Sequence, residues 1–185
     1  MSSKYFPSLL LLLAFLLFVA SSGATKVVEV GEICKKSTNP SFCLAVLNSN
    51  PGGKDLISLA QYTIDIDRAN LTNTITLIKS LIANSSGDPK ANAHYKNCLS
   101  YFVVDGGAFG AIEATQQYLN KRDYVGVNMR ATDVHYFVDY CISGDDSPGP
   151  NPPPFPDTSL LPKYAQVIQD ITEIILIISN LLEGT

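Results

Sequence analysis

Four cysteines are the residues best suited to do chemistry in this chain of 185 residues. Cys34 and Cys43 enclose a short segment that contains Asn39-Pro40, whereas Cys98 and Cys141 lie within long stretches of helical apolar spacing. An even number of cysteines behind a secretory leader is typical of disulfides formed in an oxidising compartment. The chemistry that these residues predict is therefore structural cross-linking, without a catalytic role.

The other titratable residues form no recognisable catalytic or metal-binding motif. The two histidines, His94 and His135, fall in different predicted helices and are expected at the boundary between core and surface, whereas a metal site needs several ligands at suitable spacing. There is no Gly-x-Ser-x-Gly elbow and no glycine-rich phosphate loop. Neighbouring carboxylates such as Asp65 and Asp67 are expected to be ordinary solvated charges. We therefore expect no enzyme, no cofactor and no metal.

Residues 1–24 have the features of a secretory signal peptide. Lys4 precedes an apolar run from Leu9 to Ala20, and the small residues Ser21-Ser22-Gly23-Ala24 follow. A membrane anchor is the alternative, but the run is shorter than the about 20 apolar residues that a spanning helix needs. Cleavage after Ala24 would leave 161 residues and change the formal charge from −4 to −5. Because no Lys/Arg cluster exists, neither nucleic acid nor an anionic membrane is an expected partner.

Four long segments have apolar residues at helical spacing. They run from about Asp55 to Ala83, from Asp88-Pro89 to Leu119, from about Asp123 to Ile142, and from about Ser159 to Leu182. Asp88 and Asp123 are suited to cap the free N–H groups of a helix start. The expected buried stripe of the fourth helix includes Tyr164. Asp105-Gly106-Gly107 falls in the middle of the second helix and predicts either a kink or a close approach of another backbone.

These segments predict an all-α fold, an up-down-up-down four-helix bundle at about residues 53–185 with an N-terminal helical hairpin at about 25–52. The proline-rich stretch 147–156 is expected to join the third and fourth helices; a ligand for an aromatic groove is the alternative. Four cysteines allow three pairings. Cys98 and Cys141 both occupy core-facing stripes, so we pair them with each other, and Cys34 with Cys43.

Two tripeptides match the acceptor pattern for N-glycosylation. Asn70-Leu71-Thr72 falls within the first bundle helix, and Asn84-Ser85-Ser86 falls in the turn after it. A glycan is sterically easier in the turn, so Asn84 is the more accessible of the two expected surface sites.

The segment from Ile33-Cys34 to Cys43-Leu44 resembles the N-terminal hairpin of plant invertase and pectin methylesterase inhibitors. The resemblance covers essentially all of residues 25–185, including the order and spacing of the cysteines. It is carried by Asp55-Leu56, Ser58-Leu59-Ala60, Ile64-Asp65-Ile66, Asp88-Pro89-Lys90, Tyr95-Lys96-Asn97-Cys98, Asp123-Tyr124 and the ending 167–182. The fold that this resemblance implies is a four-helix bundle with an N-terminal helical hairpin and with the first cysteine bridged to the second and the third to the fourth.

The family has two branches, which inhibit different enzymes. Invertase inhibitors carry Pro-Lys-Phe at the turn between the second and third bundle helices, whereas this chain has Lys121-Arg122-Asp123-Tyr124-Val125 there. Leu161-Pro162-Lys163-Tyr164 is superficially similar but enters the fourth helix. The resemblance therefore favours a pectin methylesterase inhibitor that is secreted to the apoplast or cell wall, monomeric when free, and blocks the substrate cleft in a non-covalent one-to-one complex.

In the esterase-inhibiting branch, polar and acidic residues of the second and third helices face the enzyme. This chain departs from that pattern, because 99–104 is nearly apolar and Ser143 stands where acidic residues are expected. The enzyme-binding residues that the resemblance implies are Asp105, Asp139, Tyr140 and Ser143. Two alternatives stay open at this point, an inhibitor of acid invertase and a four-helix carrier or structural cell-wall protein that inhibits nothing.

Overall fold

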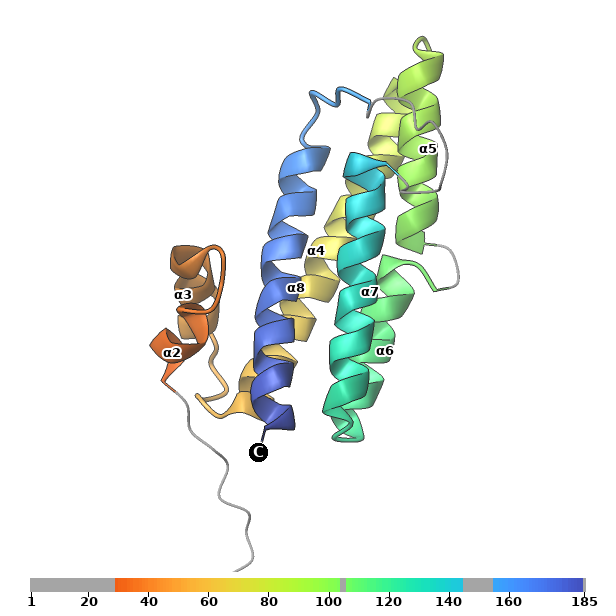
Figure 1. Ribbon diagram of the computed structural model, residues 1–185. Helices are drawn as coiled ribbons and strands as arrows, with labels where there is room; N and C mark the ends of the chain where they lie inside the picture. The colour runs from red at the N-terminus through yellow and green to blue at the C-terminus, as the bar shows by residue number, and fades with distance from the viewer. Residues whose placement is uncertain (1–28, 104–105, 145–154, 185) are drawn as a thin grey trace, which may run out of the picture.

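The computed structural model describes residues 29–103, 106–144 and 155–184, and every element assigned in these ranges is an α-helix (Figure 1). The helices are α2 (Val30–Cys34), α3 (Pro40–Asn48), α4 (Leu56–Asn84), α5 (Pro89–Val103), α6 (Ala108–Asn120), α7 (Tyr124–Ser143) and α8 (Leu161–Glu183). The predicted all-α bundle with an N-terminal helical hairpin is confirmed. The predicted leader, residues 1–24, lies outside the described residues.

Short polar side chains set the helix starts, and one of them, Asp123, is a cap that the sequence predicts. Asp55 accepts a hydrogen bond from the backbone N of Ser58 at 3.0 Å, and Asp123 accepts one from Gly126 N at 2.9 Å. Asn39 caps α3 by accepting from Phe42 N at 3.4 Å. Each cap satisfies one of the donors that the first turn of a helix leaves without an intrahelical partner.

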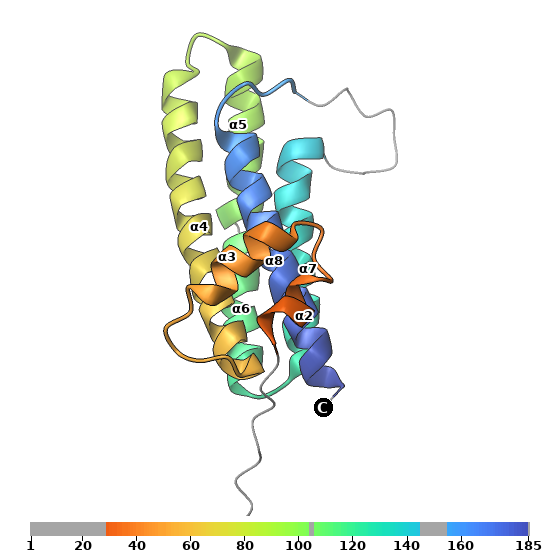
Figure 2. The same cartoon turned by 90° about the vertical axis from the view of Figure 1, so that its left-hand side faces the viewer.

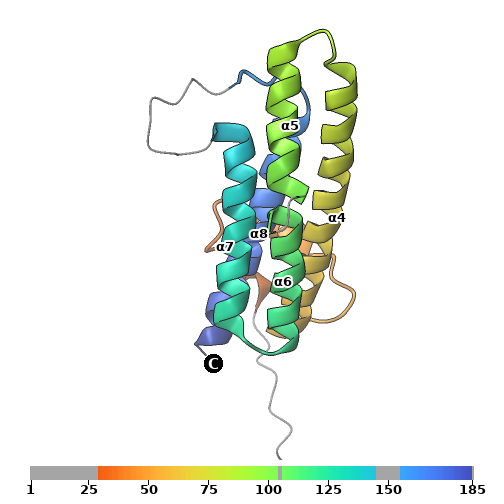
Figure 3. The same ribbon diagram turned by 90° about the vertical axis from the view of Figure 1, so that its right-hand side faces the viewer.

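The second bundle helix is interrupted, which is a larger effect than the predicted kink. Gly106 has φ +92°, a conformation that side chains disfavour, and Gly107 is the N-cap of α6. Helices α5 and α6 consequently occupy one side of the bundle as two stacked segments between α4 and α7 (Figure 3). Asp105 itself lies outside the described residues.

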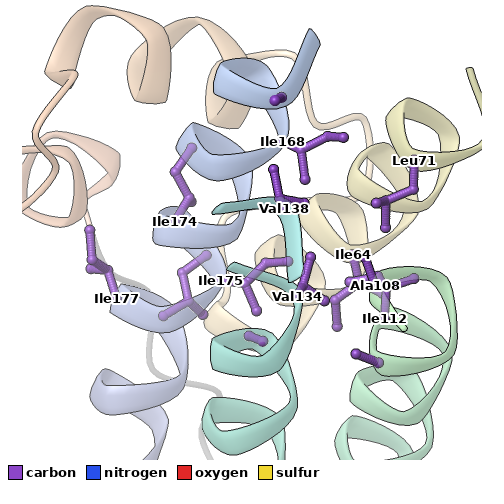
Figure 4. Close-up of a cluster of buried hydrophobic side chains, with 14 of the residues drawn as sticks. Ile64, Leu71, Ala108, Ile112, Val134, Val138, Ile168, Ile174, Ile175 and Ile177 are labelled. Atoms are coloured by element: carbon purple, nitrogen blue, oxygen red, sulfur yellow. The ribbon is translucent and has the colours of Figure 1, made fainter. Parts of the chain in front are cut away.

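The core is centred on α8, which packs against both α4 and α7. Its buried isoleucines meet side chains of α4, α6 and α7, including Ile64, Ile112 and Val134 (Figure 4). Burial of each large aliphatic side chain contributes about 1.5–3 kcal/mol. Tyr164 does not belong to this stripe, because it is 38% exposed. Leu161, three residues before it, and Ala165, the next residue, are buried instead.

The helical hairpin α2–α3 lies across α8 (Figure 2). Glu173 of α8 accepts hydrogen bonds from Ser37 Oγ at 2.7 Å and from Thr38 N at 3.1 Å. Asp170, one turn earlier, accepts from Asn39 Nδ2 at 3.0 Å. The hairpin loop is therefore fixed to the bundle by two carboxylates of the core helix.

Both disulfides join the pairs that the stripe geometry predicts. Cys34 is bonded to Cys43 within the hairpin, and Cys98 of α5 is bonded to Cys141 of α7. All four residues are buried. The second bridge ties together two helices that are far apart in sequence, which restricts the unfolded chain over a long loop.

Helix α8 also has the length and apolar composition of a membrane-spanning helix, although 56% of that stretch is buried inside the bundle. The buried core helix of a globular protein can have the same length and apolar composition. Packing of the bundle accounts for these apolar residues.

Candidate interaction surface on α5 and α7

Three of the four predicted contact residues lie together in the last turns of α7. Asp139 and Tyr140 are half-buried, and Ser143 is exposed. Ser143 Oγ donates a hydrogen bond to Asp139 Oδ1 at 3.0 Å. The fourth predicted residue, Asp105, lies outside the described residues, so the structure brings together three of them.

Two tyrosines that the sequence analysis did not select extend this group. The ring of Tyr140 lies 5.7 Å from that of Tyr101 on α5, and 6.3 Å from that of Tyr136, on which it stacks. Tyr136 is 54% exposed. The i, i+4 spacing of Tyr136 and Tyr140 was the signal in the sequence, whereas the contact with Tyr101 depends on how α5 packs on α7.

An exposed apolar row continues from these tyrosines toward the N-terminus of α7. Val125 is 57% exposed and Met129 is 61% exposed. At 3.6 residues per turn, Val125, Met129, Tyr136 and Tyr140 fall within an arc of about 60°. We call these four residues the α7 stripe. Aromatic side chains and methionine are enriched at protein interfaces, so this face has the composition of a binding surface.

A groove of about 400 Å³ lies beside the stripe, between α7, α8 and the hairpin loop. Thr38, His135, Tyr136, Asp170 and Glu173 are among its lining residues. The two carboxylates already accept hydrogen bonds from the hairpin loop. His135 Nδ1 is buried without a hydrogen-bond partner. The two carboxylates of this groove therefore serve to hold the hairpin.

His94 belongs to a structural cluster that anchors the chain entering α8. Phe155 stacks on the imidazole of His94 with 4.6 Å between the ring centroids. The Asp157 carboxylate accepts hydrogen bonds from Tyr95 Oη at 3.0 Å and from Ser159 N at 2.8 Å, and one of its oxygens lies 3.6 Å from His94 Nε2. Burial lowers the pKa of His94, while the nearby Asp157 acts in the opposite direction.

The prediction that Asp67 is a solvated charge is wrong. Its side chain is 0% exposed, and Thr172 Oγ1 donates a hydrogen bond to Oδ2 at 2.9 Å. Burial raises the pKa of Asp67 to about 8, and the hydrogen bond from Thr172 lowers it. Helical periodicity explains the error, because Asp67 falls between Ile64 and Leu71 on the core-facing side of α4. Asp65, by contrast, is exposed and pairs with Arg68.

The two predicted glycosylation sites differ in accessibility. Asn84 is the last residue of α4 and is exposed. Asn70 is half-buried within α4, where its Nδ2 donates to the carbonyl of Ile66 at 2.9 Å. Modification of either residue stays a prediction. Among the residues that the structure describes, no group of three or more His, Cys, Asp and Glu side chains could hold a metal ion.

The fold and this surface define a helical, disulfide-bridged binding protein. A family model described as plant invertase/pectin methylesterase inhibitor matches residues 29–176. A pectinesterase inhibitor of Actinidia deliciosa is 33% identical, over 100% of this chain and 96% of the relative. Pectinesterase inhibitor 1 of Arabidopsis thaliana is 32% identical, over 92% of this chain and 91% of the relative.

Solved structures agree with these sequence relationships. A pectin methylesterase inhibitor from Arabidopsis thaliana has a TM-score of 0.60 at 27% identity, covering 83% of this chain and 95% of that one. A mutant form of a pectin methylesterase inhibitor from Arabidopsis has a TM-score of 0.68 at 29% identity, with 83% and 96% covered. The chain belongs to the plant invertase/pectin methylesterase inhibitor family and is closer to its pectin methylesterase inhibitor branch. This is a family of enzyme inhibitors and not of enzymes.

Proposed function

We propose that this protein is a secreted inhibitor of plant pectin methylesterase. The relatives named above are pectinesterase inhibitors, and the turn between α6 and α7 reads Lys121-Arg122-Asp123-Tyr124-Val125, without the Pro-Lys-Phe of invertase inhibitors. The protein would act in the apoplast or cell wall, as a monomer when free.

The observation that carries this proposal is the cluster of tyrosines at the C-terminal end of α7. Tyr140 contacts Tyr101 and Tyr136 and lies beside Asp139, so an aromatic centre is bordered by a carboxylate. Buried aromatic residues with polar neighbours are the usual anchors of protein interfaces. The α7 stripe would lie over the substrate cleft of the enzyme and exclude pectin through a non-covalent one-to-one complex.

Parallel titration tests the choice of target. The mature protein, with both disulfides formed, is added in increasing amounts to a plant pectin methylesterase and to an acid invertase, and the residual activity of each is measured. We expect inhibition of the esterase that is complete near one equivalent and no inhibition of the invertase. Inhibition of the invertase alone would reverse the choice of branch. Inactivity toward both would favour a carrier or structural role.

A further inference from the structure

A carboxyl group lies in the seam between the two long helices α4 and α8. Asp67 of α4 is fully buried, and its one hydrogen bond comes from Thr172 of α8. Oδ1 is buried and has no hydrogen-bond partner. A carboxylate normally accepts several hydrogen bonds, and a buried one without a paired cation is costly. This site therefore suits the neutral acid far better than the anion.

Among the side chains that the structure describes, no cation is paired with Asp67. On α4, Arg68 points to the surface, where it pairs with Asp65 and with Glu113 of α6. On α8, Asp170 and Glu173 are bound to the hairpin loop, and Lys163 is exposed in the first turn. On α5, Lys90 and Lys96 are exposed, and His94 is held next to Asp157. Helix α3, the remaining neighbour of α4, contains no charged residue.

We propose that Asp67 is a pH-sensitive element that makes the α4–α8 seam stable at acid pH and weakens it as the pH rises. Below the transition the protonated carboxyl accepts from Thr172 and carries no charge. Above it the proton is released to solvent, and the anion remains in the core with one donor. Water reaches that anion only if α4 and α8 separate. The same two helices carry the hairpin, so its seating weakens together with the seam.

The direction of this pH effect follows from the number of protons that the folded and unfolded states bind. Burial raises the pKa of Asp67 from 3.8 to about 8 in the folded protein, so between these values the folded state holds a proton that the unfolded state has lost. Stability then falls as the pH increases from about 4 to about 8. The equilibrium constant for unfolding rises by up to tenfold per pH unit within that window from this group alone.

The test compares the mature protein with Asp67→Asn, which is isosteric, keeps an acceptor for Thr172 and never ionises. Urea unfolding is measured at pH 4.5, 6 and 8. We expect unfolding constants within a few fold of each other at pH 4.5, and a variant that is at least tenfold more stable than the parent at pH 8. Asp65→Asn is the matched control, because it removes an exposed carboxylate two residues away and should leave the profile parallel to that of the parent.

A second measurement does not depend on any variant folding. The carboxyl ¹³C resonance of Asp67 in the parent protein should titrate well above pH 6, and Thr172→Val should move that midpoint higher by removing the hydrogen bond to the anion. Titration of Asp67 near pH 4 would overturn the proposal, as would parallel stability profiles for Asp67→Asn and the parent. The proposal concerns the fold, so either result leaves the inhibitory function to be decided separately by the titration against the two enzymes.

Discussion

Titratable side chains in this bundle take their behaviour from burial more than from sequence neighbours. Asp65 and Asp67 are two residues apart on α4, yet one is paired at the surface and the other is sealed in the core. His94 is likewise shielded, by Phe155 on one ring face and by the edge of Tyr95. Burial therefore decides through which of these groups the stability of the fold depends on pH.

His94 should act on stability in the opposite direction to Asp67. Burial lowers the pKa of His94 below its ordinary value of 6.5, so the folded protein resists a proton that the unfolded chain accepts. The contribution is fully present above about pH 6.5 and is lost as the pH falls through the folded pKa. Titration of the imidazole resonances by NMR should give a midpoint below 6.5. Phe155→Ala, which opens the ring to water, should move that midpoint upward; an unchanged midpoint would show that Phe155 does not shield His94.

At the scale of helices, periodicity predicted most of the bundle. The apolar stripes located α4, α7 and α8 to within about two residues. The predicted caps Asp88 and Asp123 accept hydrogen bonds from the backbone N–H groups of Ala91 and Gly126. Cysteine pairing followed from the same stripes. These features are encoded locally, by the spacing of apolar residues and by short polar side chains.

Features that depend on packing between helices were not predicted. The glycine pair before α6 ends one helix and starts another, whereas spacing alone left a kink as a sufficient explanation. The contact between Tyr101 and Tyr140 requires the crossing of α5 and α7 to be known. Asp67 was misjudged because a charged residue at a core-facing position is rare, and only the surrounding helices show that it is enclosed.

Close packing of α6 on α7 depends on a missing side chain. A Cβ atom added at Gly126 would overlap the ring of Tyr118. Gly126→Ala should therefore lower the free energy of unfolding by about 1–3 kcal/mol, the usual cost of overpacking. Gly110→Ala on α6 is the control, because a Cβ there meets nothing within 4 Å and should stabilise the helix by about 0.4–1 kcal/mol. Urea unfolding of both variants measures these changes in the free energy of unfolding. Equal stabilisation by both substitutions would show that Tyr118 does not constrain α7.

For the whole molecule, the hairpin and the tyrosine cluster are carried by different helices and meet at the groove that Thr38 and Tyr136 line. The hairpin is fixed to α8 through Asp170 and Glu173, while Tyr101, Tyr136 and Tyr140 gather on α5 and α7. Two disulfides and the α8 core hold both parts on one frame. A rigid frame that presents aromatic side chains is suited to binding through a fixed surface, because little conformational freedom is lost on binding.

The central claim is that pectin methylesterase is bound through the C-terminal part of the α7 stripe. Isothermal titration calorimetry of the esterase with the parent protein and with Tyr140→Ala, Ser143→Asp and Leu44→Ala tests it most directly. We predict one-to-one binding, and a loss of about 2 kcal/mol or more of binding free energy for Tyr140→Ala. Ser143→Asp should bind more tightly, because it restores an acidic side chain beside Asp139. Leu44→Ala, at an exposed position of the hairpin, should leave the affinity unchanged. Equal affinities for the parent and Tyr140→Ala, with weaker binding by Leu44→Ala, would contradict the account and place the interface on the hairpin.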